Sequence, residues 1–144
     1  MVIYPALFAP DEKAGGFVVT FPDLPRGATQ GETFAEATEM ATDLLACLIS
    51  DVIEKGGALP VPSKPRGRNC HPIRLPALQS AKAELYRQFK SSGIRKSELA
   101  RRLGMPQPNV DRLFDLQHSS RLDQIEAAFR ALGKELSIQV RDAA

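Results

Sequence analysis

Residues Lys96 to Phe114 read KSELARRLGMPQPNVDRLF, and this stretch decides the fold expected for the second half of the chain. Apolar residues recur at helical spacing on both sides of a glycine: Leu99, Ala100 and Leu103, then Val110, Leu113 and Phe114. A helix-turn-helix requires a small residue where the helices cross, a glycine for the turn and an apolar residue that holds the second helix. Ala100, Gly104 and Val110 occupy these places. The stretch therefore predicts a helix-turn-helix, with an ordinary pair of packed helices as the alternative.

The second helix of such a motif enters the major groove of DNA with its N-terminal residues near the base edges. Gln107 and Asn109 are candidates to pair with adenine through their amides, and Arg112 is a candidate to reach guanine or phosphate. The residues expected to hold the DNA backbone are Lys96, Ser97, Arg101 and Arg102. Asp111 would repel phosphate unless it accepts from a cytosine amine or pairs with a neighbouring arginine.

Charge is divided unevenly along the 144 residues. Residues 1–75 carry 7 Lys and Arg against 9 Asp and Glu, whereas residues 76–144 carry 12 against 8. Between Lys82 and Arg112 the balance is 8 basic against 3 acidic residues. This local surplus fits a polyanion, and the asymmetry favours two modules with differently charged partners over chance.

The flanking segments of the second half also have regular patterns. Leu78, Ala81, Leu85 and Phe89 predict a helix that ends at Ser92–Gly93. A second helix should begin at a cap formed by Ser120 and Asp123 and end at Gly133. Apolar residues then alternate with polar ones: Leu136, Ile138 and Val140 against Glu135, Ser137 and Gln139. The alternation predicts a C-terminal strand that pairs within the module or across a dimer.

The first half reads as strands around one long helix. Strands are predicted at 2–9, 17–21, 28–30 and 71–75, with the first two paired as a hairpin. Pro5 should then lie at an edge or bulge, because it cannot donate to a ladder. The helix is predicted from Phe34 to Lys55, with a capping box of Thr33 and Glu36 before it and Gly56–Gly57 after it. Residues 56–69 read as a loop or linker.

These patterns predict an α+β protein with a β-β-β-α-β module at 1–75 and a mainly helical module at 76–144. Modules this small are marginal alone, which favours a homodimer or tetramer. No apolar run is long enough to cross a bilayer, and two cysteines are too few for a disulfide framework. We therefore expect a cytoplasmic protein.

The residues give little support for catalysis or for a cofactor. Asp23, Glu39 and Asp43 are the obvious carboxylates for a metal-dependent nuclease, but two lie four residues apart on one helix and the third lies in a proline-rich turn. The possible metal ligands Cys47, Cys70, His71 and His118 show no ligand spacing that recurs. We expect no enzyme activity, no metal and no cofactor.

In its segments and their order the chain resembles the HicB-type antitoxins of bacterial toxin–antitoxin modules, in their long form with a C-terminal DNA-binding domain. The N-terminal likeness rests on Gly16–Phe17, on Phe21–Pro25, and on Thr29–Thr33 followed by Glu36–Ala37. The C-terminal likeness rests on Glu98–Gly104, Arg112–Phe114 and Ala131–Ser137.

The resemblance implies that the first module has a partial ribonuclease-H-like fold and binds HicA, a small toxin that cleaves mRNA. It implies that the second module binds operator double-stranded DNA and represses the family's own operon. Glu36, Glu39 and Asp43 are the residues expected to contact a basic toxin. The alternative is a stand-alone helix-turn-helix transcription regulator whose first module senses a small ligand.

Overall fold

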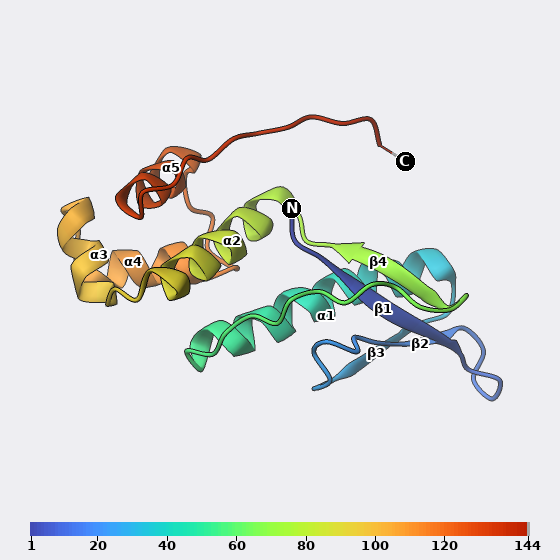
Figure 1. Ribbon diagram of the computed structural model, residues 1–144. Coiled ribbons are helices and arrows are strands. Elements are labelled where there is room, and N and C mark those ends of the chain that lie inside the picture. The colour runs from blue at the N-terminus through green and yellow to red at the C-terminus, as the bar shows by residue number, and fades with distance from the viewer. Residues whose placement is uncertain (144) are drawn as a thin grey trace.

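The computed structural model describes residues 1–143 and has an α+β architecture. Within those residues the elements follow in the order β1 (Ile3–Pro10), β2 (Phe17–Thr20), β3 (Ala28–Gly31), α1 (Phe34–Glu54), β4 (Cys70–Arg74), α2 (Ala77–Ser92), α3 (Lys96–Leu103), α4 (Gln107–Phe114) and α5 (Leu122–Ala131). Figure 1 shows the sheet and α1 in the first half and the remaining helices gathered in the second. The expected strands and helices of the first half are confirmed to within about one residue at each end.

The four strands form one antiparallel sheet in the order β3-β2-β1-β4. β1 and β2 pair as the expected hairpin, with Phe8 opposite Val19, and β4 returns along the other side of β1, with Tyr4 opposite Ile73. Alternate residues of a strand point to opposite faces, so Tyr4, Ala6 and Phe8 share one face. All three are buried, and this face carries the core of the first half.

The expectation that Pro5 lies at a sheet edge or bulge is wrong, because β1 is an inner strand. The missing N–H of Pro5 costs no hydrogen bond, because neither side of β1 offers it a partner that needs one. β2 pairs with β1 only from Leu7 to Pro10, so no strand lies on that side of Pro5. On the other side Pro5 faces Pro72 of the edge strand β4. Two residues without N–H groups therefore share one position in the ladder.

Helix α1 covers the apolar face of the sheet, and its start is fixed by side chains. Thr33 Oγ1 accepts from the Glu36 N–H at 3.1 Å, and Glu36 Oε2 accepts from the Glu32 N–H at 3.1 Å. The first bond is that of a capping box, but Glu36 accepts from the N–H of the residue before the N-cap, and not from that of Thr33 itself. β3 lies against the same end of the helix at Gly31, where an added Cβ would be 2.4 Å from the Ala37 nitrogen.

Helices α2 to α5 surround a second buried cluster, which is distinct from the one beneath α1. Its fully buried residues come from all four helices: Leu85, Leu99, Val110, Leu113, Ile125 and Ala128. α2 takes part in both clusters, because Ala83 packs with the first and Leu85 with the second. Figure 1 shows α2 lying between the sheet module and the other helices.

Two expectations for the C-terminal region need correction. The segment after Gly133 forms no strand within the described chain, and it leaves Ile138 71% and Val140 91% exposed. Pairing within the module is therefore wrong, whereas pairing across a dimer stays a prediction. Alternation alone predicts a strand only where a partner strand lies beside it. Ser120 and Asp123 also do not cap α5, which begins at Leu122 after Arg121 without a side-chain cap. Ser120 Oγ instead donates to the Arg112 carbonyl, and Asp123 accepts from Arg121.

Candidate functional site

Helices α3 and α4 are joined by a turn of three residues, as the sequence predicts. Gly104 adopts a left-handed conformation with φ of 63° and ends α3, and the Met105 N–H donates to the Ala100 carbonyl at 3.1 Å. α4 then begins after Pro106, with Pro108 in its first turn. Ala100 and Val110 are buried between the helices. The turn and this packing therefore fix the orientation of α4 relative to α3.

The C-terminal end of α4 is held by Lys82, a residue of α2 whose side chain has no exposed surface. Its Nζ donates to the carbonyl of Arg112 at 2.8 Å and to that of Asp115 at 2.7 Å. These carbonyls lie where helix amides no longer reach them and where the helix dipole is negative. Burial lowers the pKa of the Lys82 amine, and Asp115 acts in the opposite sense. Lys82 therefore links α2 to the C-terminal end of α4.

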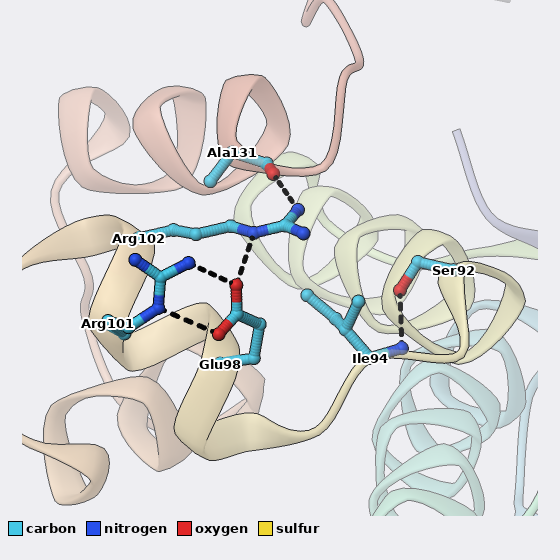
Figure 2. A network of polar contacts seen from close by, with 6 residues as sticks. All are labelled: Ser92, Ile94, Glu98, Arg101, Arg102 and Ala131. Atoms are coloured by element: carbon cyan, nitrogen blue, oxygen red, sulfur yellow. Dashed lines mark hydrogen bonds and ion pairs between the residues drawn. The ribbon is translucent and has the colours of Figure 1, made fainter.

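Glu98 forms ion pairs with both Arg101 and Arg102, which follow it on α3 (Figure 2). It accepts from Arg101 at 2.6 and 2.9 Å and from Arg102 at 3.1 Å. Arg102 also donates to the Ala131 carbonyl at the end of α5, at 2.9 Å. Hydrogen bonds from Arg101 and then Arg102 lower the pKa of Glu98 to about 2. Both guanidinium groups expected at phosphates are thus already paired, although Arg101 remains largely exposed.

The remaining candidates for DNA contact lie at or near the surface of α3 and α4. Lys96 forms an ion pair of 2.9 Å with Asp111, and both side chains stay about half exposed. Asp111 therefore pairs with a lysine of α3 and not with a neighbouring arginine. Arg112 donates to Asn109 Oδ1 at 3.3 Å, which joins two of the residues expected at base edges. Ser97, Gln107 and Arg112 are all exposed.

The acidic residues assigned to toxin contact lie along α1. Glu36 belongs to the cap of the helix, whereas Glu39 and Asp43 are exposed one turn apart on its outer face. Neither forms an ion pair within 4.0 Å in the described chain. Met40, which is 40% exposed, lies beside them. This surface combines negative charge with a flexible apolar side chain.

The carboxylates considered for catalysis do not come together. Asp23 Oδ2 accepts from the Ser63 N–H and hydroxyl at 3.0 and 3.1 Å, which fixes the linker to the loop after β2. Across residues 1–143 no group of three or more His, Cys, Asp and Glu side chains is placed to hold a metal ion. No described helix is long and apolar enough to cross a membrane.

A surface groove of about 300 Å³ lies between the linker, the loop that follows β2 and the C-terminal half of α1. Leu24, Leu48 and Val52 line it together with Asp51 and Lys55. Asp51 is paired with Lys55 at 2.9 Å and with Arg26 at 3.7 Å. This groove is where a small ligand of the first module would be sought.

Sequence reasoning missed two residues that organise this region. The spacing of Glu98 to Arg101 and Arg102, three and four residues along a helix, was the available signal for their ion pairs. Lys82 gave no comparable signal. A lysine in an amphipathic helix is expected at the surface, and only the packing of α2 against α4 shows its role.

A family model and curated relatives agree on the family to which this chain is similar. The family described as HicB-like antitoxin of bacterial toxin–antitoxin systems matches residues 3–84. The chain is 41% identical over 135 residues to Antitoxin HicB of Escherichia coli strain K12, covering 94% of this chain and 96% of that protein. It is 34% identical over 137 residues to Antitoxin HicB 1 of Photorhabdus laumondii, covering 95% and 86%. A solved toxin–antitoxin complex from Streptococcus pneumoniae is similar with 24% identity and a TM-score of 0.46, covering 79% of this chain.

Proposed function

Because the chain belongs to the HicB antitoxin family of bacterial toxin–antitoxin systems, we propose that it neutralises a HicA-like mRNA-cleaving toxin and represses its own operon. The observation that carries the first part is the near full-length match to Antitoxin HicB. The observation that carries the second is the exposed face of α3 and α4, which lies outside the residues 3–84 matched by the family but inside the match to the relatives.

In this proposal the first module binds the toxin, with the partial ribonuclease-H-like fold implied for the family. The outer face of α1 offers Glu39, Met40 and Asp43 without competing ion pairs in the described chain. A toxin that binds RNA needs a basic surface, and an acidic helix face is complementary to it. Covering that surface blocks RNA access, so inhibition requires no chemistry by this chain.

The second module would dock α4 in the major groove of operator DNA as a helix-turn-helix. Gln107, Asn109 and Arg112 would then face the bases, while Lys96, Ser97, Arg101 and Arg102 would hold phosphates. Lys96 would have to exchange Asp111 for phosphate oxygens, and Arg101 and Arg102 would have to exchange Glu98. These exposed ion pairs are weak enough to be exchanged, since surface pairs contribute roughly 0–1 kcal/mol.

The toxin role is tested by titrating this chain into an mRNA-cleavage reaction of a purified HicA-like toxin. We expect inhibition that is complete at a fixed stoichiometry and co-elution of the two proteins. A Glu39→Lys and Asp43→Lys double variant should weaken inhibition, while a Glu126→Lys variant on α5 serves as the control. Folded proteins that neither inhibit nor co-elute would contradict the proposal and favour a ligand-sensing regulator, with the groove beside α1 as its site.

The DNA role is tested by measuring binding to operator and to random duplexes. Arg112→Ala and Asn109→Ala should each weaken operator binding by about 1–3 kcal/mol and relax base preference, whereas Arg101→Ala should weaken both duplexes alike. Arg130→Ala on α5 is a control of the same charge, because Arg130 lies outside α3 and α4 and its exposed side chain pairs with Glu126. Equal losses on both duplexes for Arg112, Asn109 and Arg101 would contradict the groove assignment.

A further inference from the structure

Helices α3 and α4 carry one carboxylate each, Glu98 and Asp111, and both are paired with cations that are expected at DNA phosphates. Glu98 pairs with Arg101 at 2.6 Å and with Arg102 at 3.1 Å. Asp111 pairs with Lys96 at 2.9 Å. Guanidinium and ammonium groups bind carboxylates and phosphates through the same donors. Each carboxylate therefore occupies a place that a phosphate oxygen would take.

The two arginines differ in what else holds them, and Figure 2 shows both guanidinium groups against the one carboxylate. Arg102 also donates to the Ala131 carbonyl at the end of α5, at 2.9 Å, and its side chain is 40% exposed. Within residues 1–143 the Arg101 side chain donates to Glu98 alone, through Nε and Nη2, and it is 72% exposed. Loss of the Glu98 charge would therefore release Arg101, while Arg102 keeps one acceptor.

The ion pairs of Glu98 oppose DNA binding, although they stabilise the fold. Glu98 stays ionised at neutral pH, because hydrogen bonds from Arg101 and then Arg102 lower its pKa to about 2. A phosphate that takes Arg101 must displace this carboxylate and then lies near it, and like charges repel. The opposition is modest, since exposed ion pairs are weak and readily exchanged. Removing the carboxylate should therefore strengthen DNA binding and weaken the fold.

We propose that Glu98 limits the affinity of this protein for DNA by holding Arg101 in an ion pair that a phosphate must displace. Asp111 does the same for Lys96. This role rests on the proposed repressor function, and Glu98 fulfils it through Arg101 without reading bases. Because phosphates carry no sequence information, the affinities for operator and for random DNA are lowered alike. A purely structural role of Glu98 predicts the opposite, namely weaker binding when its charge is lost.

The test is binding of the full-length chain to operator and to random duplexes. Glu98→Gln should tighten binding to both roughly three- to tenfold, while its melting temperature falls below that of the wild type. Glu126→Gln is the matched control, because it makes the same charge change and releases Arg130 of α5. A Glu98→Gln protein that binds no more tightly than the wild type, or no more tightly than Glu126→Gln, would overturn the proposal.

A second variant guards against damage to α3. Asp111→Asn leaves Glu98 and both of its arginines in place and should tighten binding to both duplexes through Lys96. Unchanged or weaker binding by Asp111→Asn would overturn the extension of the proposal to Lys96.

A double-mutant cycle shows whether Glu98 acts through Arg101. In an Arg101→Ala background, Glu98→Gln should change affinity by less than about twofold, because the cation that it would release is absent. A gain as large as in the wild-type background would overturn the role of Arg101, since it would show that Glu98 only repels phosphate.

Retention on immobilised heparin separates this inference from the proposed function, because heparin is a polyanion without a base sequence. Glu98→Gln should elute at higher salt than the wild type and than Glu126→Gln. A wild type that binds no operator would contradict repression, while this elution order would still support the inference. Identical elution of the three proteins would overturn the inference even if the wild type binds its operator.

Discussion

Gly31 is a residue whose identity is set by contact between two elements. It ends β3 where the strand meets the first turn of α1, and a Cβ there would lie 2.4 Å from the Ala37 nitrogen and 2.6 Å from its Cα. Both atoms belong to helix backbone, which cannot move aside as the end of a side chain can. The close approach brings the edge strand onto the helix that carries the acidic surface.

We predict that Gly31→Ala lowers the free energy of unfolding by about 1–3 kcal/mol, the usual cost of overpacking. Gly27→Ala is the matched control, because its Cβ would be 3.4 Å from the Leu44 side chain, which can adjust. Urea denaturation of the two variants measures the difference. Equal stabilities would show that β3 can move away from α1 without cost.

Glu98 sets the protonation behaviour of the α3 surface. Its pKa falls from the ordinary 4.5 to about 2 in the folded protein, because it accepts hydrogen bonds from Arg101 and Arg102. A carboxyl group with a depressed folded pKa stabilises the fold fully above its unfolded pKa. That contribution is lost as the pH falls from about 4.5 toward 2.

We therefore predict that Glu98→Gln lowers the melting temperature at pH 7 and that its difference from the wild type shrinks between pH 4.5 and pH 2. Glu126→Gln removes a carboxylate paired with a single arginine, Arg130, and is the control. Thermal unfolding across this pH range supplies the data. A difference that stays constant with pH would contradict a role for the Glu98 charge.

At the scale of elements, α4 is positioned from both ends. The glycine turn after α3 sets its start, and Lys82 of α2 binds two carbonyls at its end. A buried ammonium is costly unless its protons find acceptors, and here two carbonyl groups accept from it. The orientation of α4 thus depends on a helix that precedes it by about thirty residues.

We predict that Lys82→Met destabilises the protein by about 1–3 kcal/mol, because two partly buried carbonyls lose a charged donor. Lys90→Met makes the same change at an exposed lysine of α2 and should cost less. Denaturant unfolding measures stability, and amide exchange at the end of α4 reports local fraying. An unchanged exchange rate there would refute the anchoring role.

At the scale of the whole molecule, α2 joins the two modules. Its Ser80 Oγ accepts from the Val2 N–H at 3.2 Å, and its Tyr86 hydroxyl donates to the Gly57 carbonyl. Arg87 donates to the Tyr4 hydroxyl, and Ala83 is buried in the cluster beneath α1. Packing therefore continues across the boundary predicted between residues 75 and 76, which in our proposal separates the two functions.

Residues 1–75 are expected to bind the toxin without binding DNA. We predict that a fragment of residues 1–93, which retains α2, does the same with a higher melting temperature, because it keeps the contacts of Ser80 and Ala83 with the sheet module. Calorimetric titration with toxin and thermal unfolding of both fragments provide the comparison. A fragment that folds without binding toxin would contradict the division of functions.

The candidate site could be predicted only in part from the sequence. Helical spacing placed Ala100, Gly104 and Val110 correctly, because turn and crossing residues obey local rules. Spacing along the helix makes Glu98 a possible partner of Arg101 or of Arg102, but it does not show that both pairs form at once. The pairing of Lys96 with Asp111 joins two helices, so it depends on tertiary packing.

The sequence by itself determined the elements and their order, since periodicity, caps and glycine stops act over a few residues. Only the tertiary structure decided what each element lies against. Pro5 is tolerated in an inner strand because the pairing of β1 with β2 begins only at Leu7. Lys82 is buried because its Nζ lies against the carbonyls at the C-terminal end of α4. The alternating C-terminal segment has no strand beside it in the described chain, since pairing requires a partner that local pattern cannot supply.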